Sequence, residues 1–182
     1  MEENYKLEKE YRIPFDIFRE GYRAFQKKFV YPKSYILVAV FLILAADFIY
    51  SAVKEPNNYL TYILAMICLS LGFREWYNPR KIRRQIIDAV HELGEPVYKI
   101  LVAETYADIS TVVSLQKTEE DDSGDDEETL PEPTRIPFDN NFSIEEYDSL
   151  FLIIYGKSVF YIVPKNDFSE SELNILRDMK RK

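Results

Sequence analysis

The sequence predicts an α+β fold in which a two-helix transmembrane hairpin is joined to a small antiparallel β domain closed by a C-terminal helix. Three observations lead to this prediction. Two apolar runs lie close together at residues 34–53 and 59–73, strand-like segments recur from residue 97 to residue 163, and a well-capped helix follows. The mean hydropathy of the chain, −0.27, is slightly polar, so membrane segments must be few.

The net charge of −8 comes from one local segment. Residues 119–128 hold eight acidic side chains, and the rest of the chain balances 23 basic against 23 acidic residues. Without a basic footprint, nucleic-acid binding is not expected. The single Cys and single His exclude an internal disulfide and a zinc site of the usual His/Cys type, and no cofactor or metal is expected.

Residues 1–33 are expected to form a cytoplasmic strand and an amphipathic aromatic and basic helix. Residues 5–13 alternate loosely, as strands do, and Pro14 suits the opening of a helix. The aromatic residues that follow recur at spacings of 3 and 4, which places them on one stripe: Phe15, Phe18, Tyr22, Phe25 and Phe29. Packing on the soluble domain and a position in the membrane surface are both open for this helix.

Residues 34–53 are predicted to cross the membrane. As a helix these 20 residues span about 30 Å, roughly the hydrocarbon thickness of a bilayer. Eleven of them are Leu, Ile, Val or Phe, which favours insertion by roughly 3 to 7 kcal/mol. Asp47, the only ionisable residue predicted inside a span, opposes insertion by at most about 3 kcal/mol. Insertion is therefore favoured.

Residues 57–77 are predicted to return through the membrane, which makes 34–77 the hairpin. The charge-free part, Tyr59 to Phe73, has only 15 residues, so its crossing must be tilted or the bilayer thinned. The turn contains one basic residue, Lys54, whereas basic residues flank both outer ends of the pair. The positive-inside rule therefore predicts two spans in the cell (inner, cytoplasmic) membrane with both termini cytoplasmic.

Residues 78–94 are predicted to form a separate basic helix beside the membrane. Asn78 suits the N-cap, Pro79 the first helical position and Gly94 a left-handed C-terminal residue. Cations at the start of this helix suit a negatively charged leaflet. Together with those of the aromatic helix, they are the candidate lipid head-group contacts: Arg19, Arg23, Lys27, Lys28, Arg80, Lys81, Arg83 and Arg84.

Residues 95–182 are predicted to form the β-rich domain, with an exposed acidic loop at 118–129. Its clearest hairpin joins Leu150–Tyr155 to Ser158–Val163 through Gly156-Lys157, as a two-residue type II′ turn. The strand in this hairpin is apolar at four successive positions from Phe151, which predicts that both of its faces are covered.

The C-terminal helix carries the strongest local signal. Ser169 and Glu172 have the spacing of a capping box, and Phe168 and Leu173 occupy the positions of a hydrophobic staple. Arg177 and the basic residues after it complement the C-terminal end of the helix dipole.

Two segments resemble the closing part of the YcxB-like family of bacterial membrane proteins. They run from Glu145 to Tyr155 and from Phe160 to Phe168, an apolar hairpin that leads into a Val-Pro-Lys step before the last helix. The order of elements along the chain is also similar to that family. The resemblance implies that the β-rich domain is PH-like, and it implies no catalytic residues. The acidic segment at 119–128 departs from the family's pattern.

No catalytic constellation follows from the sequence, so an enzyme is not expected. One His excludes a Ser-His-Asp set, the five glycines form no phosphate-binding loop, and the acidic run lacks EF-hand spacing. The leading hypothesis is a non-enzymatic membrane-anchored protein that presents its PH-like domain to lipid, or to an unidentified protein partner, at the cytoplasmic face. An accessory or regulatory subunit of a membrane transporter or sensor, assembled through Asp47, is one alternative; a soluble globular protein with a buried helical hairpin is another.

Overall fold

The computed structural model describes residues 5–112 and 133–179 of the chain. These residues divide into two compact units, a β unit made of Met1–Gly21 with Asp88–Lys182 and a hairpin unit made of Tyr22–Ile87. The mixed α+β class with a C-terminal helix is confirmed. The predicted acidic loop at 118–129 lies outside the described residues.

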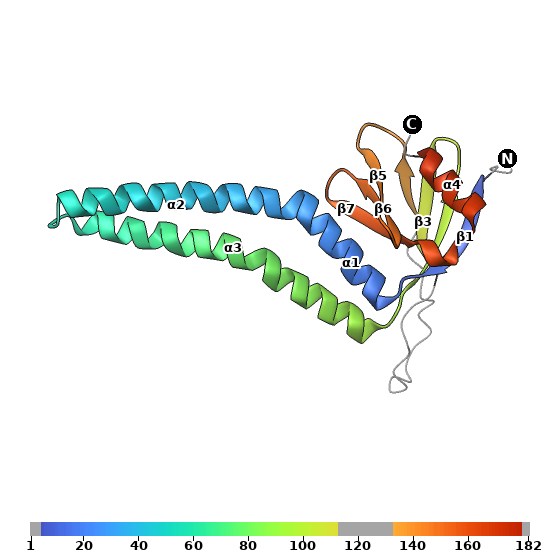
Figure 1. Cartoon of the computed structure of the whole chain (residues 1–182), viewed down its shortest axis with the longest axis horizontal. Helices are drawn as coiled ribbons and strands as arrows, with labels where there is room; N and C mark the ends of the chain where they lie inside the picture. Colours follow the sequence, from blue (N-terminus) through green and yellow to red (C-terminus); the bar gives the residue numbers. More distant parts are fainter. Residues whose placement is uncertain (1–4, 113–132, 180–182) are drawn as a thin grey trace, which may run out of the picture. The chain divides into compact units, whose positions relative to one another are not determined.

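The β unit contains two antiparallel sheets (Figure 1). The first has the order β1–β2–β3–β4, with bounds Leu7–Arg12, Val97–Val102, Tyr106–Thr111 and Thr134–Pro137. The second has the order β5–β6–β7, with bounds Phe142–Glu146, Leu150–Tyr155 and Val159–Pro164. A short 3₁₀ helix, η2 (Lys165–Asp167), and α4 (Glu170–Met179) follow.

The N-terminal strand belongs to the first sheet rather than to a separate N-terminal segment. β1 pairs with β2 from Leu7 opposite Val102 to Arg12 opposite Val97. The helical hairpin is therefore inserted in the sequence between two neighbouring strands of one sheet. The partner of a strand is a non-local property, and the alternation of residues 5–13 carries no information about it.

The core of the β unit forms between its sheets and α4. Phe151, Leu152, Ile153 and Ile154 of β6 are all buried, so the prediction that this strand is covered on both faces is confirmed. Leu173 and Leu176 of α4 are buried as well. The predicted capping box is also confirmed, because Ser169 N–H donates to Glu172 Oε2 at 2.7 Å and Glu172 N–H donates to Ser169 Oγ at 3.4 Å.

The turn between β6 and β7 differs from the prediction. Tyr155 pairs with Val159, so three residues connect the strands instead of two. The two central residues of the turn are Gly156, with φ 61°, and Lys157, with φ 64°. Positive φ at both of these positions defines a type I′ turn. The predicted type II′ turn is wrong because Lys157 also adopts the left-handed conformation, which is rare for a non-glycine residue.

The hairpin consists of two long helical stretches that run side by side in opposite directions (Figure 1). The first is continuous from α1 (Phe15–Phe25) through a π-helical segment, η1 (Gln26–Val30), into α2 (Tyr31–Lys54). The second is α3 (Tyr59–Leu93). The predicted crossing at residues 34–53 therefore lies within a longer helix.

The separate basic helix predicted at 78–94 is wrong. α3 runs through Asn78 and Pro79 without a break, so the second apolar run and the basic segment form one helix. Proline costs a helix one backbone hydrogen bond and crowds the preceding turn. Contacts from the first helical stretch compensate for that loss, and the local pattern around Asn78 does not reveal those contacts.

Within the described residues, one helical stretch is long and apolar enough to cross a membrane, Phe15–Lys54. The prediction of two such helices is not confirmed, because the apolar part of α3 ends at Phe73, where Arg74 and Glu75 follow. The coarser expectation of one membrane-compatible helix holds by length and composition.

Candidate functional site: the helical hairpin

The buried residues of α2 and of the apolar part of α3 are small. α2 buries Ser34, Ala45 and Ala52, and α3 buries Ala65, Cys68 and Gly72. They recur at intervals of three, four, seven or eleven residues, each close to a whole number of helical turns, so each set lies on one face of its helix. A Cβ added at Gly72 would lie 3.4 Å from Phe41 Cβ, which places Gly72 directly against α2. Small residues at a helix contact are typical of membrane helices, which gain little from burying large apolar groups against each other.

The large apolar residues of the hairpin point outward. Ile36 and Ile43 on α2 are 65% and 70% exposed, and Ile63 and Met66 on α3 are 55% and 67% exposed. Many neighbours share this exposure, among them Leu37, Val40, Leu42, Ile49, Val53, Leu60, Ile67 and Leu69. Soluble monomers rarely expose a continuous apolar surface of this kind.

Pro79 and Ser34 form a matched pair across the hairpin. A proline at position 79 cannot donate to the carbonyl oxygen four residues earlier, which belongs to Glu75. Ser34 Oγ donates to that same oxygen. The buried hydroxyl of α2 therefore replaces the backbone donor that α3 lacks.

A second polar contact lies at the same end of the hairpin. Gln26 is 1% exposed, and its Nε2 donates to Pro79 O at 3.0 Å. Tyr31 Oη donates to Gln26 Oε1 at 3.4 Å, and Arg83 Nη1 donates to Tyr31 Oη at 3.2 Å. The chain of bonds from Arg83 to Pro79 joins η1, α2 and α3. Gln26 begins the π-helical segment, so the irregular turn of one helix faces the proline of the other.

These contacts bring the two basic segments to one end of the hairpin. Residues 23–33 and residues 74–84 together contain nine Lys and Arg, whereas Lys54 is the one basic residue of the turn at the opposite end. The predicted head-group cations of the hairpin therefore lie at its base, the end opposite the turn.

The eight predicted head-group cations fall into two groups. Six are exposed: Arg19, Arg23, Lys27, Lys28, Lys81 and Arg84. Arg80 and Arg83 are only half-exposed. Arg80 stacks its guanidinium 4.1 Å from the Trp76 ring centroid and donates to Trp76 O, and Arg83 belongs to the Gln26 chain. These two side chains stabilise the hairpin through contacts with its own residues.

Asp47 is exposed on α2, seven residues before the helix ends at Lys54. It has no hydrogen bond or ion pair with any residue that the structure describes. A carboxylate on the outer face of an apolar helix must reach water, or pair with a group from outside this chain.

Glu146 lies at the centre of an ion cluster in the β unit. Its carboxylate is 2.9 Å from Lys165 Nζ and 3.0 Å from Arg177 Nη2, which links β5 to η2 and α4. Hydrogen bonds from Arg177 and then from Lys165 lower the pKa of Glu146 to about 2. This cluster ties the C-terminal helix to the second sheet.

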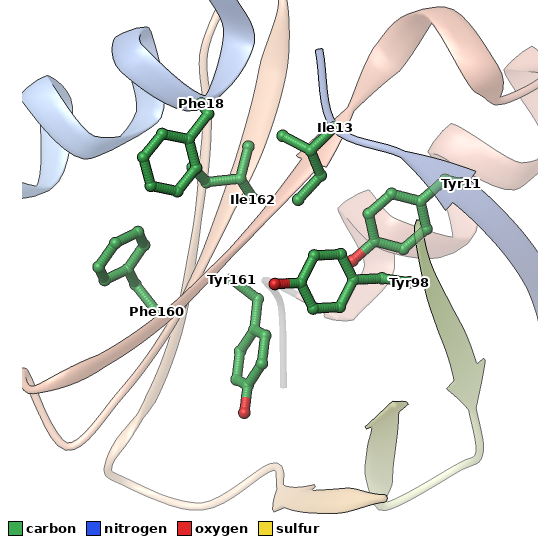
Figure 2. Close-up of a pocket in the computed structure, with 7 residues that line it drawn as sticks. All are labelled: Tyr11, Ile13, Phe18, Tyr98, Phe160, Tyr161 and Ile162. Atoms are coloured by element: carbon green, nitrogen blue, oxygen red, sulfur yellow. The ribbon is translucent and has the colours of Figure 1, made fainter. Parts of the chain in front are cut away.

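A cavity of about 120 Å³ in the β unit is lined by five aromatic rings and two isoleucines (Figure 2): Tyr11, Ile13, Phe18, Tyr98, Phe160, Tyr161 and Ile162. Tyr11 is 3% exposed, and its hydroxyl has no hydrogen-bond partner among the described residues. An unpaired buried hydroxyl costs about 1 to 3 kcal/mol. Sequence reasoning missed this cavity, because its residues come from β1, the connection from β1 to α1, α1, β2 and β7.

Among the described residues, no three His, Cys, Asp or Glu side chains gather where they would hold a metal ion. The hairpin therefore offers an exposed apolar surface, hydrogen bonds between its two helices, and exposed cations at its base. Together with the β unit, these features define a membrane-compatible helical hairpin inserted into an antiparallel α+β domain.

Residues 127–179 match the family of YcxB-like protein. The match covers β4 to α4 and includes both segments on which the predicted resemblance depends, so the resemblance is confirmed over this C-terminal part of the chain. Neither a curated protein nor a solved structure matches the chain.

Proposed function

We propose that this chain is a non-enzymatic membrane anchor whose α2–α3 hairpin crosses the cell membrane twice and carries a PH-like interaction domain at the cytoplasmic face. One observation carries the proposal: α2 and the apolar part of α3 bury alanine, serine, cysteine and glycine and expose isoleucine, leucine and methionine. This arrangement suits a lipid solvent and is unfavourable in water. It also argues against a soluble protein that buries this hairpin in its own core.

The pairing of the helices supports a return crossing. α3 alone is short of apolar residues, but it contacts α2 at both ends of the hairpin. Ser34 bonds Glu75 O near the base, and Tyr62 Oη donates to Ala52 O at 3.3 Å near the turn. A helix held against a membrane-spanning partner over this length crosses the same layer, with Arg74 reaching toward the head groups.

The PH-like assignment rests on topology. A four-stranded and a three-stranded antiparallel sheet, followed by one C-terminal helix, support it. The family match over the closing segment supports it further. The exposed cations at the base of the hairpin would keep the domain close to anionic head groups.

Cysteine labelling tests the topology. In a Cys68→Ala background, Asn57→Cys reports on the hairpin turn and Asn140→Cys on an exposed turn of the β unit. A membrane-impermeant thiol reagent should label Asn57→Cys in intact cells and Asn140→Cys only after permeabilisation. Labelling of both positions in intact cells, or of Asn140→Cys alone, would contradict the proposal.

A second candidate function is supported by Asp47. An exposed carboxylate within the apolar length of α2 is suited to pair with a basic or polar group of another membrane protein. The chain would then be an accessory or regulatory subunit of a transporter or sensor. A defined complex isolated in mild detergent should be lost on Asp47→Leu and retained on Ala46→Leu; a monomer that is indifferent to both changes excludes this candidate.

A further inference from the structure

The aromatic cavity of the β unit has the size of a small-molecule site. Its volume is about 120 Å³, close to that of a dry apolar cavity of about 150 Å³ that binds benzene. In Figure 2, the rings of Phe18, Phe160, Tyr98 and Tyr161 lie around one space, with Ile162 beside Phe18 and Ile13 between Phe18 and Tyr98. A cavity of this size accommodates a single ring.

The Tyr11 ring is held on two sides, so its hydroxyl is fixed in position. The ring stacks on Tyr98 with centroids 6.1 Å apart and an angle of 26° between the planes. It also packs against Phe168 at 5.7 Å. The hydroxyl points from β1 toward Tyr98 (Figure 2), where no described residue bonds to it. A buried polar group held in this way matches the few placed polar atoms of ligand pockets.

The lining carries no formal charge. None of the seven lining residues is a cation that could bind an anion. The rings could contact an ammonium group, but no lining carboxylate could pair with it. Burial, with the neighbouring Tyr98 and Tyr161, raises the pKa of Tyr11, so its hydroxyl stays protonated and available as a donor.

We propose that this cavity binds a small neutral molecule with one flat ring and one hydrogen-bonding oxygen, and that the oxygen bonds to the Tyr11 hydroxyl. The rings and isoleucines supply apolar contact, and Tyr11 supplies selectivity for an oxygen-bearing ring over a bare one. This inference concerns the β unit alone and does not depend on the hairpin crossing a membrane.

Methyl NMR of the full-length chain in lipid nanodiscs tests the proposal, with phenol, benzene, benzoate and tetramethylammonium as probes. The isoleucine δ1 methyl signals of Ile13 and Ile162 report ring-current shifts from a bound ring, and buried Ile109 of β3 serves as the control signal. Phenol should shift both lining methyls saturably and bind at least fivefold more tightly than benzene. Benzoate and tetramethylammonium should leave all three signals in place.

Tyr11→Phe should lower the affinity for phenol at least threefold, toward that for benzene, and the hydroxyls of the other lining tyrosines, Tyr98 and Tyr161, account for any preference for phenol that is left. Tyr155→Phe is the matched control, because the Tyr155 hydroxyl bonds Asp139 outside the cavity, and it should change neither affinity. If Tyr11→Phe fails to fold, as judged by the Ile109 signal, Phe160→Trp narrows the cavity instead and should weaken phenol binding at least tenfold. The proposal is overturned by an absence of saturable shifts, by equal affinities for phenol and benzene in the unmodified chain, by preferred binding of either ion, or by unchanged phenol binding in both variants.

Discussion

The Ser34 hydroxyl of α2 donates to the backbone carbonyl oxygen of Glu75 in α3, the oxygen that Pro79 leaves without its helical donor. The same proline's own carbonyl oxygen accepts from Gln26. Two side chains of the first helical stretch therefore satisfy backbone carbonyl oxygens of α3 around Pro79, and one of them, Gln26, begins the π-helical segment. In a low-dielectric surrounding such bonds set which residues of the two helices lie opposite each other.

This pairing predicts a non-additive mutant cycle. Ser34→Ala should destabilise the hairpin by about 0.6 to 1.7 kcal/mol, because Glu75 O loses its donor. Pro79→Ala restores the backbone N–H, so Ser34→Ala in that background should cost clearly less. Unfolding in mixed micelles by SDS titration, followed by circular dichroism, measures both changes. Ser70→Ala is the control, since Ser70 bonds Met66 O within its own helix; equal costs of Ser34→Ala in both backgrounds would refute the pairing.

The small residues at the contact between α2 and α3 predict that substitutions of two neighbouring alanines, Ala45 and Ala46, have very different effects on stability. Ala45 is 1% exposed, whereas Ala46 is exposed. Ala45→Leu should destabilise the hairpin by roughly 1 to 3 kcal/mol, because the added atoms have no room between the helices. Ala46→Leu should leave its stability unchanged, or slightly raise its affinity for lipid. The same SDS titration compares them, and equal effects would mean that the helices do not pack through this face.

The Glu146 cluster predicts a pH-dependent contribution to the stability of the β unit. The folded-state pKa of about 2 lies below the ordinary value of 4.5, so the contribution is present above pH 4.5 and is lost as the pH falls toward 2. Glu146→Gln should lower the free energy of unfolding at pH 7 by roughly 1 kcal/mol, a value limited by solvent screening. Its difference from the unmodified chain should vanish near pH 2.

Thermal unfolding between pH 7 and pH 2 checks this behaviour. Asp148→Asn is the control, because it removes an exposed carboxylate outside the cluster. A Glu146→Gln deficit that is constant over the whole pH range would show that the side chain acts through packing alone.

Elements with local signals could be predicted from the sequence. The capping box of Ser169 and Glu172 depends on residues three positions apart, and the covered strand from Phe151 depends on four adjacent apolar residues. The aromatic stripe of the first helix was also visible from its spacing: Tyr22 and Phe25 are buried, whereas Arg19, Arg23, Lys27 and Lys28 are exposed. In each case the deciding interactions lie within a few residues.

Features that depend on distant partners could not be predicted. Pro79 ends a helix in most local contexts, and only Ser34 and Gln26, about 50 residues earlier, make its place inside α3 tolerable. The β1–β2 pairing spans the whole hairpin. The aromatic cavity assembles from four separate elements, none of which carries a motif.

Accessibility measured along both helices tests the return crossing of α3 most directly. Spin labels at exposed positions of α2 (Ile36, Ile43, Ile49) and α3 (Ile63, Ile67) in a Cys68→Ala chain, reconstituted in liposomes, report contact with oxygen in lipid and with a nickel chelate in water. If both helices cross, Ile43 and Ile67 should show high oxygen and low nickel accessibility. High nickel accessibility at Ile63 and Ile67 together, with Ile43 in lipid, would show that α3 does not cross and would contradict the proposed double-spanning anchor.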